Sequence, residues 1–171
     1  MPEADRTHTT TLVVGVMPGQ ADAVVQQAAL FASRMDASLA LATVDTTRYT
    51  TNRGSDGTIT AFAIDPDAGD EITEEFDPLL AAHLRTALEA TGIAWSLHAL
   101  AGDPSQELAR LADDLGALAI VVGTRKPGLR TSAHEFFNGS VAVHLAHRQH
   151  RPVIVIPVEP VGSGTRLPWE G

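Results

Sequence analysis

One stretch of the chain combines glycines and cations in a pattern suited to holding an anion. Residues 121–140, VVGTRKPGLRTSAHEFFNGS, end an apolar run in Gly-Thr and open a helical pattern with Asn-Gly-Ser. Glycine lets the backbone approach a ligand closely, and the free N–H groups at a helix amino terminus stabilise a phosphate. Arg125, Lys126 and Arg130 add positive charge beside these glycines. The stretch predicts a phosphate-binding loop, unless its glycines form only a strand-end turn and an ordinary helix cap.

The composition of the whole chain limits what such a loop could bind. Twelve Lys and Arg stand against 21 Asp and Glu, which gives a formal net charge of −9. Bulk attraction to a nucleic acid is therefore excluded, and any phosphate recognition has to be local. The chain has no cysteine, so disulfides and thiolate metal sites are excluded as well.

The same composition sets expectations for size and location. A chain of 171 residues with 44% hydrophobic content is long enough for one compact domain with a sizeable core. No charged-then-apolar run resembles a signal peptide, and no apolar run is long enough for a membrane span. Together with the missing cysteines, this favours a cytoplasmic protein that does not associate with membranes.

Short β-branched runs alternate with helical patterns along most of the chain. Helices of ten or more residues between strands imply right-handed crossovers and a parallel sheet. The sequence therefore predicts an α/β fold, a three-layer αβα sandwich with a doubly wound, five-stranded parallel sheet. The expected strands are Thr11–Met17, Ser38–Val44, Ile93–Leu100, Ala117–Val122 and Val153–Val158, and the expected helices are Ala21–Met35, Glu71–Thr91, a third capped by Asp103 with Pro104 at its first position, and Gly139–His147.

Residues 45–72 break this alternation. TTRYTTNRGSDG is polar and contains glycine, which indicates a mobile excursion from the sheet. Thr58–Ile64 within it has the composition of a short extra strand. The excursion follows the second strand, a position from which it can lean over the ligand crevice, but its purpose is not evident from its residues.

The expected crevice lies at the carboxyl ends of the strands, where the strand order reverses. If the first and fourth strands flank that reversal, Met17–Gly19 and Gly123–Gly128 leave the sheet side by side. Gly139 and Ser140 then begin the fourth helix, whose amino end points at the same place.

The order of these elements and five short motifs resemble the universal stress protein family over about residues 10–158. The motifs are the first strand running into its turn, Gly102-Asp103-Pro104, Val121–Arg125, Gly139-Ser140-Val141 and Arg151–Pro157. The resemblance implies a flavodoxin-like domain over 10–158, with flexible termini at 1–9 and 159–171. It also implies a stress-associated binding or regulatory role, a homodimer, and in one branch of the family the binding of ATP or another adenine nucleotide.

The family's nucleotide motif assigns candidate residues on this chain. It reads glycine, two residues, glycine, nine residues, then glycine with Ser or Thr; Gly123 and Gly139-Ser140 match its ends. Lys126 occupies the second glycine's place, three extra residues separate the ends, and Met17 stands where relatives often carry Asp. The residues expected to bind a nucleotide are Gly123, Gly128, Gly139, Ser140 and Val141, and Thr124, Arg125 and Lys126 are added from chemistry as phosphate contacts.

Two other classes of function stay open at this point. An enzyme is not expected, because no nucleophile elbow surrounds Ser140 and the helical carboxylates have the pattern of solvated faces. His144, His147 and His150 recur at intervals of three without a nearby acidic partner, so no metal site is predicted. A ligand-free interaction module is the alternative, since the apolar Val153–Val158 strand at a sheet edge would pair with a second copy.

Overall fold

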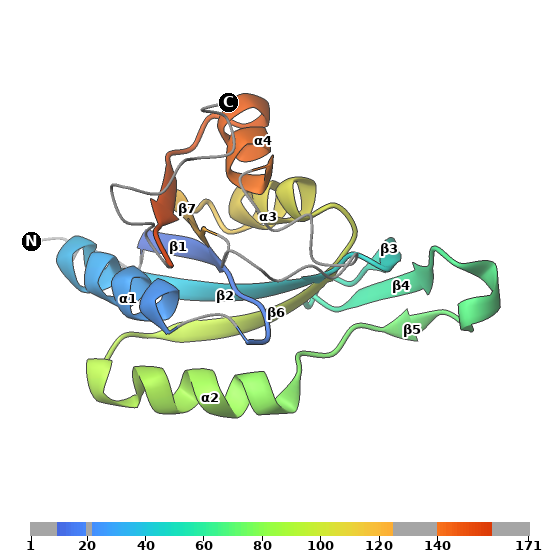
Figure 1. Cartoon of the computed structure of the whole chain (residues 1–171), viewed down its shortest axis with the longest axis horizontal. Coiled ribbons are helices and arrows are strands. Elements are labelled where there is room, and N and C mark those ends of the chain that lie inside the picture. The colour runs from blue at the N-terminus through green and yellow to red at the C-terminus, as the bar shows by residue number, and fades with distance from the viewer. Residues whose placement is uncertain (1–9, 20–21, 125–139, 159–171) are drawn as a thin grey trace, which may run out of the picture.

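Five parallel strands form the centre of the protein in its computed structural model, which describes residues 10–19, 22–124 and 140–158 (Figure 1). Each strand pairs in parallel with its neighbours. The sheet has the order β6-β2-β1-β7-β8. Its strands are β1 (Thr10–Gly15), β2 (Ala37–Asp45), β6 (Trp95–Ala101), β7 (Ala119–Gly123) and β8 (Val153–Ile156).

This order confirms the predicted doubly wound sheet. Numbered along the chain, the five parallel strands lie in the order 3-2-1-4-5, whereas flavodoxin itself has 2-1-3-4-5. The chain starts in the middle of the sheet, builds outward through β2 to β6, and then returns to the other side of β1 with β7 and β8. The reversal therefore lies between β1 and β7, the first and fourth strands.

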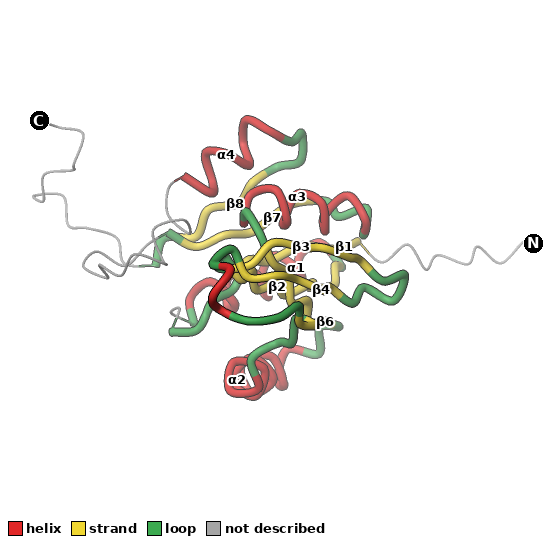
Figure 2. Tube along the Cα trace, turned by 90° about the vertical axis from the view of Figure 1, so that its right-hand side faces the viewer, coloured by secondary structure: helices red, strands yellow, loops and turns green. Residues whose placement is uncertain are grey.

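Two helices cover each face of the sheet, which completes the predicted three layers. Figures 1 and 2 show α3 and α4 on one side of the strands and α2 on the other; α1 lies on the same side as α2 (Figure 1). The helices are α1 (Ala23–Met35), α2 (Pro78–Leu88), α3 (Pro104–Asp114) and α4 (Ser140–Arg148).

The core is divided by the sheet into two apolar clusters. Along β1, Leu12 and Val14 face the cluster that contains residues of α1 and α2. Val13 between them faces the cluster that contains residues of α3 and α4. All three side chains are fully buried, as expected for the central strand of a parallel sheet.

The excursion at 45–72 is ordered, which corrects the expectation of a mobile segment. It forms a three-stranded antiparallel sheet of β3 (Arg48–Arg53), β4 (Ile59–Ala63) and β5 (Ile72–Thr73). The expected extra strand is confirmed as β4. Ile59 and Ala61 of this strand are buried in the cluster beside α3, so core contacts hold the small sheet in place.

The predicted helix Glu71–Thr91 is wrong at its amino end. Ile72 and Thr73 pair with β4 as β5, and α2 begins only at Pro78. Proline disfavours a helical residue before it and suits the first helical position. The Asp77 carboxylate accepts from the N–H of Leu80 at 2.7 Å, which caps the helix there. The predicted stop at Gly92 is confirmed by its φ of 67°.

The start of α3 follows the sequence prediction. Asp103 is the N-cap, its carboxylate accepts from the N–H of Gln106 at 3.0 Å, and Pro104 is the first helical residue. The chain reaches this cap through Gly102, whose φ of 131° is unfavourable for residues with a side chain. The N–H of Gly102 donates to the carbonyl of Asp45 at the end of β2, so the two strand ends are joined.

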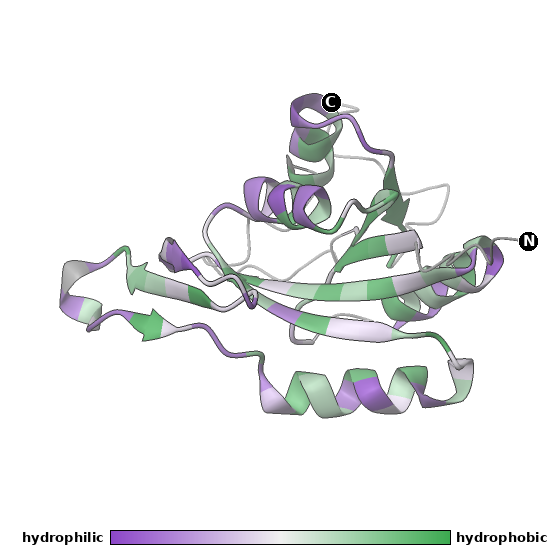
Figure 3. Cartoon of the chain, turned by 180° about the vertical axis from the view of Figure 1, so that it is seen from behind, coloured by the Kyte–Doolittle hydropathy of each residue, from purple (hydrophilic) through white to green (hydrophobic). Residues whose placement is uncertain are grey.

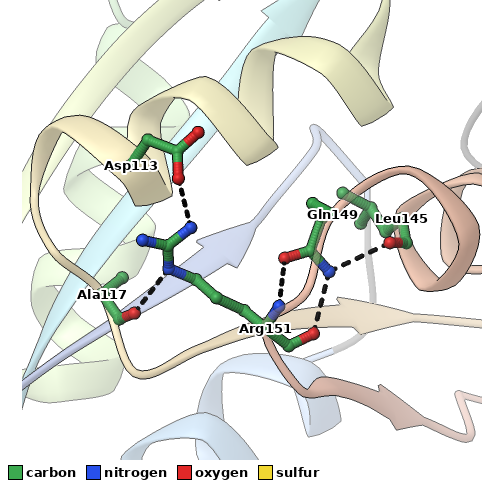
Figure 4. A network of polar contacts seen from close by, with 5 residues as sticks. All are labelled: Asp113, Ala117, Leu145, Gln149 and Arg151. Atoms are coloured by element: carbon green, nitrogen blue, oxygen red, sulfur yellow. Dashed lines mark hydrogen bonds and ion pairs between the residues drawn. The ribbon is translucent and has the colours of Figure 1, made fainter.

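A polar network near the amino ends of β7 and β8 holds the carboxyl end of α4 in place (Figure 4). The guanidinium of Arg151 donates through Nε to the carbonyl of Ala117 at 2.8 Å and forms an ion pair with Asp113. The amide of Gln149 donates to the carbonyls of both Leu145 and Arg151, and its oxygen accepts from the N–H of Arg151. The network therefore joins α3, α4, and the starts of β7 and β8.

We expect Arg151→Met to lower the free energy of unfolding by about 1–3 kcal/mol, because the substitution leaves the Ala117 carbonyl and the Asp113 carboxylate without their donor. Urea denaturation followed by circular dichroism measures this change. The control is Arg34→Met at an exposed position of α1, which should change stability by less than about 0.5 kcal/mol. Equal effects of the two substitutions would contradict the assigned role of the network.

Candidate functional site

The strand order brings the two predicted exits of the chain together at one edge of the sheet. Val14 of β1 lies opposite Val121 of β7, so both strands leave the sheet at the same carboxyl edge. Beyond β1, the N–H of Val16 still donates to the carbonyl of Ala42 on β2. Met17 and Gly123 therefore follow neighbouring strands on either side of the strand-order reversal, where α/β sheets bind ligands.

Helix α4 directs its amino end at the same edge. It connects the parallel strands β7 and β8, and a crossover helix runs antiparallel to the strands that it joins. Val141 in its first turn is 4% exposed and Leu145 is fully buried, so both anchor the helix in the core. The amino end of the helix, with the positive end of its dipole, is thus held at this edge of the sheet.

The outgoing end of β7 is tied to β8. The N–H of Thr124 donates to the carbonyl of Ile156 at 2.8 Å, and the Thr124 hydroxyl accepts from the N–H of Val158 at 2.9 Å. Thr124 was predicted as a phosphate contact; its hydroxyl oxygen already holds the end of β8. Its hydroxyl hydrogen remains to be donated.

Four of the eight predicted site residues belong to the described part of the chain. Gly123, Thr124, Ser140 and Val141 lie at the end of β7 and the start of α4, so the structure brings these two segments to one edge. The other four, Arg125, Lys126, Gly128 and Gly139, lie outside the described residues.

Asp103 adds a negative charge at the amino end of α3, on the side where α4 packs. Burial acts to raise the pKa of Asp103, but hydrogen bonds from Ser105 and Gln106, with a smaller contribution from the charge of His144, hold this pKa below its ordinary value. Asp103 therefore carries its negative charge at neutral pH. Sequence reasoning identified Asp103 only as a helix cap, because the approach of α4 to α3 is not visible in the sequence.

No metal centre is present in the part of the chain that the structure describes. Within it, no three His, Asp or Glu side chains are grouped so that they could hold an ion. His144, His147 and His150 are all exposed, as expected for residues near a helix carboxyl end. Among the described helices, none is long and apolar enough to cross a membrane.

A comparison with protein-family models decides the classification. The model of the universal stress protein family matches residues 8–157, which include both strand exits, the small sheet and α4. This chain belongs to the universal stress protein family. No curated protein matches the sequence.

Solved structures support the same fold for this universal stress protein. A universal stress protein in complex with cAMP is 24% identical, with a TM-score of 0.54, and the match covers 88% of this chain and 98% of that one. One from Archaeoglobus fulgidus in complex with dAMP is 20% identical, with a TM-score of 0.53 and coverage of 86% and 97%. One from Arabidopsis thaliana with AMP bound is 15% identical, with a TM-score of 0.51 and coverage of 88% and 92%.

A second group of charged side chains lies at the end of β2. The Asp45 carboxylate accepts from the N–H and the hydroxyl of Thr47 and forms an ion pair with Arg48. Glu74, which follows β5, has one buried carboxylate oxygen without a hydrogen-bond partner. Burial raises the pKa of Glu74, the negative charge of Asp45 raises it further, and Arg48 opposes the rise. Sequence reasoning missed this group because it placed Glu74 on a solvated helix face.

We expect Glu74→Gln to stabilise the protein at neutral pH. A carboxyl group whose pKa is raised on folding favours the fold while it is protonated, and this contribution is lost as the pH rises through the folded pKa. The thermal midpoint of the variant should exceed that of the wild type at pH 7, and the difference should shrink as the pH falls through the carboxyl range. Glu75→Gln, at the exposed neighbouring position, is the control. A wild type more stable than the Gln variant at pH 7 would contradict the assignment.

Proposed function

We propose that this universal stress protein binds ATP or a related adenine nucleotide at the carboxyl edge of its sheet and acts as a stress-associated regulator. The single observation that carries the proposal is the convergence of Gly123, at the end of β7, with the first turn of α4 beside the exit of β1. The adenine nucleotides bound to structures of the same fold support it: cAMP, dAMP and AMP.

The phosphates would be held mainly by backbone groups. Helix α4 offers its free N–H groups at Ser140 and Val141, and the buried Val141 side chain keeps this turn from moving away. In a chain of net charge −9, a nucleotide needs local positive charge, and the sequence between β7 and α4 contains Arg125 and Lys126, which lie outside the described residues.

The nucleoside end is expected to differ from that of the typical nucleotide-binding relatives. Met17 offers a thioether at the end of β1, which can contact a base but cannot accept a hydrogen bond as a carboxylate does. We therefore propose a nucleotide held by its phosphates more than by its sugar. This arrangement fits a sensor with modest affinity.

A dedicated catalytic role is not part of the proposal. Binding of a nucleotide is sufficient for a regulator whose conformation responds to its ligand. The cytoplasm is the proposed location, since a chain without cysteine suits a reducing compartment.

We expect isothermal titration with ATP, ADP, AMP and cyclic AMP to detect binding of at least one nucleotide. Gly139→Asp should weaken it by at least about tenfold, because the substitution places a negative charge immediately before the first residue of α4. Steady-state hydrolysis of ATP should stay well below about 1 per second.

Gly116→Asp is the matched control for this titration. It adds the same charge after α3, where φ is 57° and a Cβ atom meets nothing within 4 Å, and Asp tolerates this backbone region better than most residues. Binding should be unchanged. Absence of heat for all four nucleotides at millimolar concentration would contradict nucleotide binding and favour a ligand-free module.

We also propose a homodimer formed through β8, since this strand lies at an open edge of the sheet. The carbonyls of Pro152 and Ile156 accept from β7, so the alternation of the ladder turns the N–H and C=O of Val155 outward. The Val155 side chain is 44% exposed. An exposed apolar edge strand with unpaired backbone groups is suited to antiparallel pairing across a two-fold axis.

We expect light scattering to find a dimer for the wild type and a monomer for Val155→Pro, because proline removes the outward N–H without removing a bond to β7. Val155→Thr has nearly the same shape and keeps the N–H, so it should remain a dimer. A monomeric wild type, or a dimer that tolerates proline at this position, would rule out pairing through β8.

A further inference from the structure

A cavity separates the small antiparallel sheet from α3. Its volume is about 490 Å³, and it is lined by β3, by the end of β6 and by the first two turns of α3. Small-molecule sites in proteins commonly have volumes of about 300–1,000 Å³. Gly123 and Val141 do not line this cavity, so it is a different place from the nucleotide crevice.

One side of the cavity is a polar stripe of α3. Asp103, Gln106, Glu107 and Arg110 recur at i, i+3, i+4 and i+7, which places them on one face of the helix. A polar helix face normally lies against solvent. Here the small sheet covers it in part, and Figure 3 shows that both α3 and β3 are largely hydrophilic.

The other side is β3, whose sequence RYTTNR is polar throughout. The small sheet makes its apolar contacts with the core through β4, where Ile59 and Ala61 are buried. Strand β3 is held beside α3 by the Thr50 hydroxyl, which donates to the carbonyl of Ala101 at 2.8 Å, and by the ion pair of Arg53 with Glu107. The cavity between β3 and α3 therefore has hydrogen-bonding groups on both sides, which suits a polar ligand.

An ion pair between β3 and α3, with the Arg53 side chain 25% exposed, lines the cavity. Arg53 donates to the Glu107 carboxylate, and Glu107 is 7% exposed. The Nε of Arg53 is buried and has no hydrogen-bond partner. Since this Nε is closed to solvent, a ligand in the cavity can reach only the exposed part of the Arg53 side chain.

The charges at the cavity limit the kind of ligand that it can bind. Two guanidinium groups, of Arg53 and Arg110, are balanced by two carboxylates, of Asp103 and Glu107, so neither an anion nor a cation is favoured. Planar amide, guanidinium and carboxylate groups can each form hydrogen bonds to two neighbouring hydroxyl groups of one ligand. Tyr49 lines the cavity through its place on β3, but its ring lies beside that of Phe62, on the face of the small sheet opposite the buried Ala61.

We propose that this cavity binds a small neutral polyol, such as a monosaccharide or a disaccharide. Asn52 and Gln106 donate to and accept from the hydroxyl groups at the open side. The exposed part of the Arg53 guanidinium donates to a ligand hydroxyl beside its ion pair with Glu107.

Titration of the ¹⁵N-labelled full chain with glucose, trehalose and glycerol, followed by amide NMR spectra, tests the proposal. At least one of the two sugars should shift the amide signals of Asn52, Gln106 and Glu107, with a dissociation constant in the millimolar range. Phosphate and acetate serve as anionic probes and should leave these three signals in place. Selective shifts by the anions, or no shift by either sugar, would overturn the proposal.

Two exposed side chains allow a substitution test that does not endanger the fold. Asn52→Ala and Gln106→Ala should each weaken sugar binding about five- to tenfold, as expected for the loss of one or two hydrogen bonds. Gln27→Ala, at an exposed glutamine of α1, should leave it unchanged. Equal binding by all three variants would show that the sugar binds elsewhere and would overturn the proposal, whereas nucleotide titration of Gln106→Ala reports separately on the crevice.

Discussion

Burial of β1 on both faces is the constraint from which the rest of the arrangement follows. Leu12, Val13 and Val14 are all fully buried, although consecutive residues of a strand point to opposite faces. Helices must therefore cover both sides, and the chain can supply them only by building outward from β1 in two directions. The reversal of strand order beside β1 is a consequence of this requirement. The convergence of the ends of β1 and β7 with the amino end of α4 follows from the same requirement.

Strands and helices whose apolar residues recur at the spacing typical of their type could be predicted from the sequence. All five parallel strands and four helices were expected near their observed positions, because runs such as Leu12–Val14 and the leucines of α3 are governed by core contacts. Of the small sheet only β4 was expected, and β3 and β5 were missed for the opposite reason. Strand β3 is polar and depends on pairing with β4, so its Thr and Tyr residues show their preference for strands only in the presence of a partner. Pro78 carried the information needed to shorten α2.

The candidate sites divide in a similar way. Gly123, Ser140 and Val141 could be placed at the crevice, because they follow directly from chain order and the rule for parallel crossovers. The groups formed by Asp45 with Glu74 and by Arg53 with Glu107 could not, because each joins residues more than 25 positions apart that meet only after the small sheet has folded onto the rim. The spacing of charged residues in a sequence does not show which residues they will pair with. A carboxylate on a solvated helix face therefore cannot be told from one that is buried against a distant partner.

The turn Gly102-Asp103 links the two proposed binding regions. On one side, Asp103 caps α3 beside the cavity, and Glu107 lies 3.4 Å from the position that a Cβ of Gly102 would occupy. On the other side, the charge of His144 on α4 acts on the same carboxylate, one turn after Ser140. The N–H of Gly102 also holds the end of β2 through Asp45. This turn is therefore the element that the two proposed binding regions have in common, and any coupling between their ligands would be reciprocal by thermodynamic linkage.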